Sequence, residues 1–297
     1  MSVLEFTKLE LEHIPMIRPF FLQQNRRICD CTIGSTMMWR NYFDNRFAIV
    51  EDTLIFRSRY LDGQFAFTVP IGKDPQRLRE LMEEYCTRHD IAPVFCTVTP
   101  NDLDLLRERW PNLTVEANRD WFDYLYESRD IVEFAGRKYA AQRNHIHRFE
   151  RECPDWSFSP MTAEHVEEVR RFYQEFLQER TKQSDTAQAE AEEIFEVLDH
   201  YDQYAFLGGI LRVEGKIAGI SMGEIVRDTL FVHIEKADLR YPGVYQKLVN
   251  CFAREFVTED VRYINREEDV GDPGLRKSKL AYRPVALQEK YTVRVER

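Results

Sequence analysis

The segment LEFTKLELEHIPMIRPFF (residues 4–21) has a counterpart half a chain later, WSFSPMTAEHVEEVRRFY (residues 156–173). The two align without a gap when Phe6 is placed on Phe158, an offset of 158 − 6 = 152 residues. In each segment a short alternating stretch and a Glu-His pair precede a pattern of apolar residues spaced three to four apart, which is typical of an amphipathic helix. We therefore expect the order strand then helix twice, at the start of two similar halves.

The residues downstream extend this order in both halves. Apolar runs with turn residues between them predict a further series of strands and helices. In the first half we expect strands at 47–60, 64–69, 94–98 and 121–126 and a short helix at 102–110. In the second half we expect strands at 205–213, 217–226, 229–235, 263–265 and 291–295 and helices at 244–256 and 275–280. This order predicts an α/β fold with two mixed, mostly antiparallel sheets flanked by helices.

A basic helix separates the two halves. Residues 134–150 have a helical pattern that is rich in Arg, Lys and His, and the Cys153-Pro154-Asp155 run ends it. The sequence thus predicts a first lobe at 1–133, a linking helix at 134–153 and a second lobe at 154–297. The polar and Ala-rich stretch 181–193 is interpreted as a solvated loop.

Composition restricts the function classes. The 297 residues include 51 acidic against 41 Lys and Arg side chains, a net charge of −10 that disfavours nucleic acid, tRNA included, or anionic lipid as a general partner, and we expect no DNA partner. No apolar run is long enough to span a bilayer, and residues 1–20 lack a signal-peptide pattern, so we expect a cytoplasmic protein. Six scattered cysteines form no metal-binding or disulfide pattern, and we expect no metal site.

Three segments of the second half resemble one known family. GRKYAAQRNHIHRFE (136–150), HIEKADLRYPGVYQKLVNCF (233–252) and YINREEDVGDPGLRKSKLAYRP (263–284) are similar to the C-terminal domain of phosphatidylglycerol lysyltransferases. The resemblance implies two tandem GNAT-like acyltransferase lobes. It also implies transfer of an aminoacyl group from a charged tRNA, which the characterised members deliver to a lipid. This chain lacks the membrane-spanning half of those members, so a lipid acceptor is not expected.

The donor remains open between two compounds. GNAT enzymes that use coenzyme A carry an R/Q-x-x-G-x-G/A loop for the pyrophosphate, whereas this chain has a single glycine in its place, within Arg240-Tyr241-Pro242-Gly243. Either acetyl-coenzyme A or aminoacyl-tRNA is therefore a possible donor substrate. We expect no permanently bound cofactor, and the sequence leaves the oligomeric state undetermined.

Several polar residues are candidates for the site. In the basic helix, the resemblance favours Arg143 and Asn144 as cleft residues; the alternative is a solvated linking helix. His233 and Glu235, two apart on a predicted strand, should share one face, where a carboxylate and an imidazole could act as a general base. The alternative is a structural ion pair. Tyr245 could bind substrate or simply pack.

The segments that follow add charge near the same strand ends. Asn265, Arg266, Glu267 and Asp269 follow a short strand, where α/β folds place ligand-binding groups; carboxylates there could bind an ammonium and Arg266 a phosphate or carboxylate. Arg276 and Lys279 lie in a helix whose first turns are cationic, which opposes the helix dipole unless an anion binds. The alternative is a set of surface charges that aid solubility.

Taken together, these residues predict an acyl or aminoacyl transferase that acts on an amine or hydroxyl, with its site in the second lobe. Glu235 or His233 would serve as the base, and Arg266, Arg276 and Lys279 would bind the donor or the developing negative charge. The competing hypothesis is a non-catalytic module, derived from a transferase, that binds a small ligand.

Overall fold

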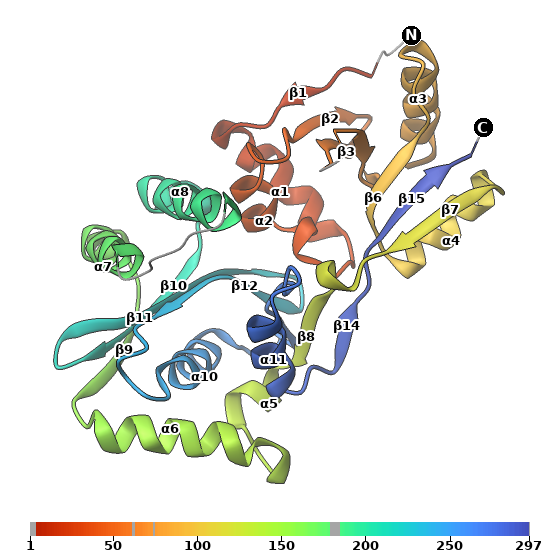
Figure 1. Ribbon diagram of the computed structural model, residues 1–297. Helices are drawn as coiled ribbons and strands as arrows, with labels where there is room; N and C mark the ends of the chain where they lie inside the picture. Colours follow the sequence, from red (N-terminus) through yellow and green to blue (C-terminus); the bar gives the residue numbers. More distant parts are fainter. Residues whose placement is uncertain (1–3, 61–62, 74, 179–184, 297) are drawn as a thin grey trace. The chain divides into compact units, whose positions relative to one another are not determined.

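The computed structural model describes residues 4–60, 63–73, 75–178 and 185–296. The chain forms two compact units (Figure 1). Unit 1 comprises residues 1–123, 268–272 and 287–297, and unit 2 comprises residues 124–267 and 273–286. Each unit is built on its own mixed sheet.

The sheet of unit 1 has the strand order β1-β2-β3-β4-β6-β15-β7, with β5 paired to β3. β4 and β6 are parallel, and the other neighbours are antiparallel. The strands are β1 (Thr7–Lys8), β2 (Arg46–Val50), β3 (Thr53–Arg59), β4 (Phe65–Phe67), β5 (Ile71–Gly72), β6 (Val94–Val98), β7 (Leu113–Ala117) and β15 (Tyr291–Val295).

Helices complete unit 1. They are α1 (Ile14–Gln23), α2 (Ile33–Met38), α3 (Pro75–Arg88) and α4 (Pro100–Arg109). Met82 of α3 and Leu106 of α4 are fully buried against Phe67, Phe95 and Val293 of the sheet, and this cluster forms the core. Burying such side chains is the main favourable term in folding, at about 25 cal/mol per Å² of apolar surface.

The sheet of unit 2 has the order β14-β8-β13-β12-β11-β10-β9. β12 and β13 are parallel, whereas β13-β8, β12-β11, β11-β10 and β10-β9 are antiparallel. The strands are β8 (Asp123–Glu127), β9 (Trp156–Pro160), β10 (Leu207–Val213), β11 (Lys216–Val226), β12 (Thr229–Ala237), β13 (Tyr263–Asn265) and β14 (Ala286–Gln288).

Helices cover both faces of this sheet. On one face α10 (Val244–Phe256) contacts β10, β11 and β12, and α5 (Ser128–Glu133) and α6 (Ala140–Glu152) pack against α10 (Figure 1). On the other lie α7 (Val166–Gln178) and α8 (Asp185–Asp199), with α9 (Tyr201–Tyr204) after α8. α10 connects β12 to β13, and α11 (Pro273–Ala281) follows β13. The expected α/β fold class, with two mixed, mostly antiparallel sheets flanked by helices, is confirmed.

The first helix of each half begins with the same side-chain device. In unit 1 the His13 ring accepts a hydrogen bond from the backbone N–H of Glu10 (3.0 Å), and in unit 2 the His165 ring accepts one from the N–H of Thr162 (3.1 Å). In both, the side chain of the capping residue is also bonded to the third residue of the turn, which makes a reciprocal capping box. The two histidines differ by 165 − 13 = 152 positions, the offset of the sequence alignment.

Each sheet takes one strand from the other half of the sequence. In unit 1 this strand is β15, which lies beside β6 of the parallel pair, and in unit 2 it is β8, which lies beside β13 of the parallel pair. The sequence instead placed 121–126 in the first lobe and 291–295 in the second, with a boundary between 133 and 153, so the structural division differs from the expected one. Residue patterns identify a strand, but they do not identify the neighbour with which it pairs.

Candidate functional site

β12 and β13 run side by side for only three residue pairs and then separate. Their register joins Thr229, Leu230 and Phe231 of β12 to the three residues of β13, after which β12 continues to Ala237 paired with β11 on its other side. In open α/β sheets ligands bind beyond the carboxyl ends of parallel strands, where neighbouring segments diverge. This part of unit 2 is therefore the first place to look for a site.

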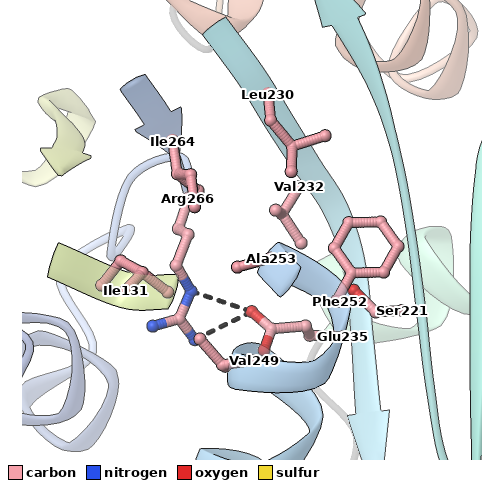
Figure 2. Close-up of a pocket in the computed structure, with 10 residues that line it drawn as sticks. All are labelled: Ile131, Ser221, Leu230, Val232, Glu235, Val249, Phe252, Ala253, Ile264 and Arg266. Carbon is pink, nitrogen blue, oxygen red and sulfur yellow. Dashed lines mark hydrogen bonds and ion pairs between the residues drawn. The ribbon is translucent and has the colours of Figure 1, made fainter. Parts of the chain in front are cut away.

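An ion pair lies where the two strands separate. Nε and Nη2 of Arg266, the residue after β13, donate to Oε2 of Glu235, near the end of β12, at 2.9 and 2.8 Å (Figure 2). Both side chains are largely buried, with 9% of Arg266 and 15% of Glu235 exposed. The parallel-strand geometry thus brings together two of the residues that the sequence singled out.

The surroundings of Arg266 hold its guanidinium in place. It lies 4.6 Å from the centre of the Tyr282 ring, and Nζ of Lys279 donates to the Arg266 carbonyl oxygen at 2.5 Å. Burial alone would lower the pKa of Arg266, but the charge and hydrogen bonds of Glu235, together with the neighbouring Tyr282 and Tyr126, outweigh it and raise that pKa. Burial raises the pKa of Tyr282 to about 12. Arg266 is therefore a fixed positive charge, and Tyr282 is a neutral phenol.

A β-bulge places His233 on the opposite face of the sheet from Glu235. Val232 pairs with Gly223 and Ile234 with Met222, so His233 is an extra residue in β12. Val232 and Glu235 line the same cavity, three positions apart, because the extra residue shifts the alternation by one. The prediction that His233 and Glu235 share a face was wrong for this reason.

His233 is held between two carboxylates. Its Nδ1 lies 2.7 Å from Oε1 of Glu267, and its Nε2 lies 3.1 Å from Oε1 of Glu224 on β11. Burial would lower the pKa of His233, but the hydrogen bonds to both carboxylates outweigh it and raise the pKa to about 9. At neutral pH the imidazole is therefore already the cation, with a proton on both nitrogens, and its side chain is 1% exposed. This arrangement does not suit a general base.

The three cations expected to bind the donor, Arg266, Arg276 and Lys279, do not line one shared cavity. Lys279 is buried and its Nζ is bonded to the backbone after β13, while Arg276 is half-buried on α11. Asn265 is buried and its Oδ1 accepts from the N–H of Glu267 at 2.7 Å. Asp269 belongs to unit 1, where its carboxylate accepts from Arg119 at 3.4 Å and from the N–H of Gly271 at 3.0 Å. These contacts shape the loop and helix after β13.

The candidate residues on α6 and α10 lie away from the Glu235–Arg266 pair. Nη1 of Arg143 donates to the carbonyl oxygens of Phe134 and Gly136 (2.7 Å for the latter), so this side chain ties α6 to the segment after α5. Asn144 is exposed on α6. Tyr245 is half-buried against the core between α6, α10 and the sheet. The structure thus does not bring these three residues to the Glu235–Arg266 pair.

The lone glycine before α10 has a packing role. Gly243 has φ +87°, and a Cβ there would lie 2.2 Å from the carbonyl oxygen of His145 on α6. The preceding Arg240 is bound by Asp238, with Nη2 2.6 Å from Oδ2. In this loop Gly243 therefore permits close packing against α6, and Arg240 is paired with Asp238.

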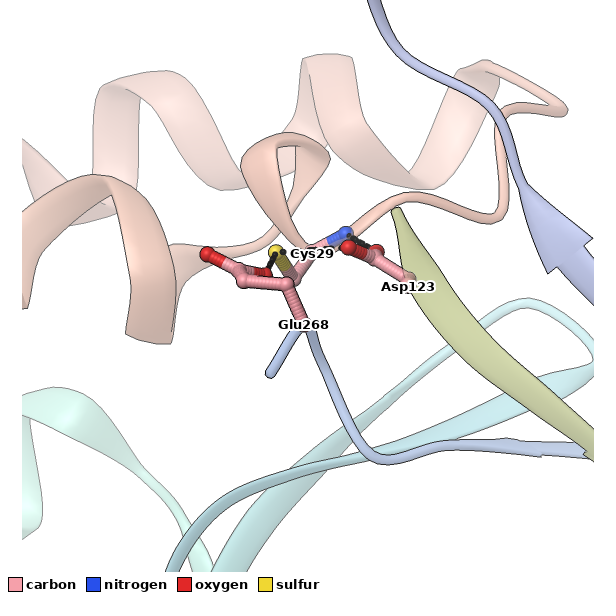
Figure 3. A group of neighbouring side chains, drawn as sticks. All are labelled: Cys29, Asp123 and Glu268. Atoms are coloured by element: carbon pink, nitrogen blue, oxygen red, sulfur yellow. Dashed lines mark hydrogen bonds between the residues drawn. The ribbon is translucent and has the colours of Figure 1, made fainter. Parts of the chain in front are cut away.

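Sequence reasoning missed a second cluster, which lies in unit 1. Nζ of Lys290 lies 2.7 Å from Oδ1 of Asp123, 2.9 Å from Oδ2 of Asp30 and 3.5 Å from Oε2 of Glu268. Sγ of Cys29 is 3.5 Å from the same Nζ. Figure 3 shows Cys29, Asp123 and Glu268, which come from three distant segments. The available signal was a charged residue beside each strand that joins the sheet of the other half, namely Asp123 at the start of β8 and Lys290 before β15.

The ammonium of Lys290 takes the central position in this cluster. Cys29, Asp123 and Glu268 each offer one atom within 4.8 Å of the others, close enough to share a metal ion. The nearby carboxylates outweigh the effect of burial and raise the pKa of Lys290, so the ammonium is kept, while burial raises the pKa of the Cys29 thiol. Glu268, between the predicted carboxylates Glu267 and Asp269, faces this ammonium of the chain itself.

Two mixed sheets, each with one parallel pair and helices around it, place the chain in the mixed α/β class. Within that class it belongs to the family described as phosphatidylglycerol lysyltransferase, C-terminal, which matches residues 23–294. The resemblance seen in the sequence is confirmed.

Solved structures agree with this placement. A conserved protein of unknown function from Bacteroides thetaiotaomicron is 30% identical, with 99% of this chain and 100% of that chain covered and a TM-score of 0.92. The C-terminal domain of a putative lysylphosphatidylglycerol synthetase from Agrobacterium fabrum shares the fold at 14% identity, covering 96% and 92% of the two chains with a TM-score of 0.67. L-PGS from Bacillus licheniformis does so at 16% identity, with coverage of 95% and 92% and a TM-score of 0.65.

One sequence relative is an uncharacterized protein of Mycoplasmoides gallisepticum, 24% identical over 175 residues, or 58% of this chain. The match spans 56% of that relative's length. Among the helices that the structure describes, none combines the length and the apolar character that crossing a membrane requires.

Proposed function

We propose that the protein is a transferase that moves an acyl or aminoacyl group to an amine or hydroxyl acceptor. Membership of the lysyltransferase family supports the class of reaction. The observation that carries the proposal is the Glu235–Arg266 pair at the point where β12 and β13 separate. It sets a proton acceptor and a fixed positive charge side by side in a largely buried position, which strengthens their electrostatic effect.

Each member of the pair has a role in the proposed reaction. The acceptor's nitrogen or oxygen attacks the carbonyl carbon of the donor, a new bond forms there, and the acceptor's proton passes to Glu235. Arg266 stabilises the negative charge that develops on the carbonyl oxygen. That charge returns to form the carbonyl again as the bond to the leaving oxygen or sulfur breaks, and the proton held by Glu235 passes to the leaving group, which restores the carboxylate. Because the two side chains are bonded to each other, the substrates must first separate the pair.

We propose aminoacyl-tRNA as the donor ahead of acetyl-coenzyme A. In this chain the loop before α10 has a single glycine, Gly243, which packs closely against α6, so the loop lacks the glycine-rich backbone with which coenzyme A-dependent GNAT enzymes bind a pyrophosphate. In this proposal the cationic groups that contact RNA phosphates are Arg148 and Arg151, which are exposed on α6 and are both paired with Glu152 in this structure. The matched capping boxes support the proposal that the two halves are a tandem repeat. We also propose that the protein acts in the cytosol.

A donor screen with matched variants tests this function. Purified protein is incubated with labelled aminoacyl-tRNA or acetyl-coenzyme A and a panel of amines and hydroxyl compounds, and label transfer is measured. Glu235→Gln should reduce turnover at least about a hundredfold, the usual contribution of a general base. Glu190→Gln, which removes the partner of Lys236 on the opposite face of the sheet, should leave turnover unchanged. Equal activity of Glu235→Gln and the wild type would refute the role of Glu235.

One observation favours the alternative, a non-catalytic module that binds a small ligand. Glu235 and Arg266 are bonded to each other and His233 is protonated, so the site has no free base, whereas the opposite charges of the pair match those of a zwitterion that would separate them. Calorimetric binding of an amino acid or its ester, lost in Arg266→Met and without turnover of any donor, would establish this alternative.

A further inference from the structure

A small cavity lies beside the Glu235–Arg266 pair. It is enclosed by β11, β12, β13, α5 and α10, and most of its lining is apolar, including Leu230, Val232 and Phe252 (Figure 2). Its volume is about 10 Å³. One water molecule needs a cavity of about 10–15 Å³, so this space fits a single water and is too small for a substrate group.

Polar atoms from three different strands or strand ends line this apolar space. Among the described residues, Oγ of Ser221, Oε1 of Glu235 and Nη1 of Arg266 are buried and have no hydrogen-bond partner. Ser221 is 1% exposed and pairs with Glu235 across β11 and β12. Leaving a buried polar group without a hydrogen bond destabilises the folded state, so three such atoms around one cavity strongly favour an occupant.

The chemistry of the three atoms selects the occupant. The guanidinium can only donate, the carboxylate can only accept, and the hydroxyl can do either. An anion would be repelled by Glu235 and a cation by Arg266, whereas a neutral donor and acceptor satisfies both. Buried waters typically make about three hydrogen bonds, the number of partners available here.

We propose that unit 2 contains one buried water molecule, bound by Ser221, Glu235 and Arg266. The water accepts from Nη1 of Arg266 and Oγ of Ser221, and it donates to Oε1 of Glu235. With Oε2 already held by Arg266, this bond fixes both oxygens of the carboxylate. Ser221 is thereby a positioning residue for Glu235. This role rests on the proposed function, in which Glu235 takes the acceptor's proton.

A high-resolution crystal structure of the wild-type protein tests the water site without any assay. We expect a single density peak within hydrogen-bond distance of all three atoms. A dry cavity, or a direct bond between Nη1 of Arg266 and Oε1 of Glu235, would overturn the proposal. This readout is independent of turnover, so it decides the question even if no donor is ever found.

Ser221→Ala tests the positioning role, with Ser157→Ala on the exposed edge strand β9 as the matched control. In the label-transfer assay Ser221→Ala should lower kcat several-fold and leave KM unchanged, because the acceptor still binds while the carboxylate is less well held. The control should match the wild type in both. Retention of full kcat with the water lost from the crystal structure of Ser221→Ala would show that Ser221 does not position Glu235. If Ser221→Ala fails to fold, Ser221→Gly, which leaves room for a second water in place of the hydroxyl, should have a kcat close to that of the wild type; a loss as large as that of Glu235→Gln would count against the water.

Discussion

His233 and Glu267 share a hydrogen bond of 2.7 Å, and this contact, with that to Glu224, makes folding stability depend on pH. The pKa of His233 is raised from 6.5 to about 9, so the folded state holds the proton more tightly than the unfolded chain. The resulting stabilisation is complete below pH 6.5 and is lost as the pH rises to about 9. Urea denaturation at a series of pH values should show this decline.

His233→Gln provides the control for that measurement. The variant should be less stable than the wild type at pH 6, because the buried carboxylate of Glu224 and the partly buried one of Glu267 lose their cation. Its stability should vary less between pH 6.5 and 9, since the proton that titrates in this range is gone. If the two proteins lose stability in parallel across this range, another group is responsible.

Lys290→Met should strongly destabilise unit 1. Lys290 is 5% exposed and faces the carboxylates of Asp30, Asp123 and Glu268, which would repel one another without it. Removing one partner of a buried charge network costs about 3–5 kcal/mol. Lys73→Met removes an exposed pair with Asp52 and should cost less than about 1 kcal/mol. Urea denaturation curves for both variants test the contrast, and a similar loss in both would mean that the cluster contributes little.

Much of the fold could be predicted from residue patterns. The helix at 244–256 and the strands at 263–265 and 291–295 have the expected bounds, because apolar periodicity and turn residues are local signals. The interpretation of 181–193 as a loop was wrong from Asp185 onward, where α8 begins; residues 179–184 lie outside the described part of the chain. Ala, Gln and Glu have high helix propensity, and this outweighs the polarity of the stretch.

The candidate site was harder to predict, because it depends on pairing between strands. Glu235 and Arg266 were both named from the sequence, but their contact requires the parallel register of β12 and β13. The bulge at His233 has no signature in the local sequence, and it reversed the face on which that side chain lies. Ser221 was not predicted at all, because a serine within an apolar strand gives no sign that it lines a cavity.

The cysteines should be unreactive in the folded protein. All six are buried. Burial raises the pKa of Cys31 to about 12, of Cys86 to about 11 and of Cys96 to about 12, so little of the reactive thiolate forms. A chromogenic disulfide reagent should therefore label native protein very slowly and all six thiols in urea. Rapid labelling of Cys29 in native protein, identified by mass spectrometry, would show that the cluster around Lys290 opens readily.

Gly243→Ala separates two costs at the start of α10. Gly243 and Gly215 both have positive φ, at +87° and +76°, so alanine at either site meets the left-handed backbone penalty of about 1–2 kcal/mol. At Gly215 a new Cβ would have no atom within 4 Å, whereas at Gly243 it would lie 2.2 Å from the backbone oxygen of His145. A backbone atom cannot move aside as a flexible side chain can, so α10 and α6 must shift apart. Gly243→Ala should thus cost clearly more stability in urea than Gly215→Ala, and equal losses would show that α6 adjusts without strain.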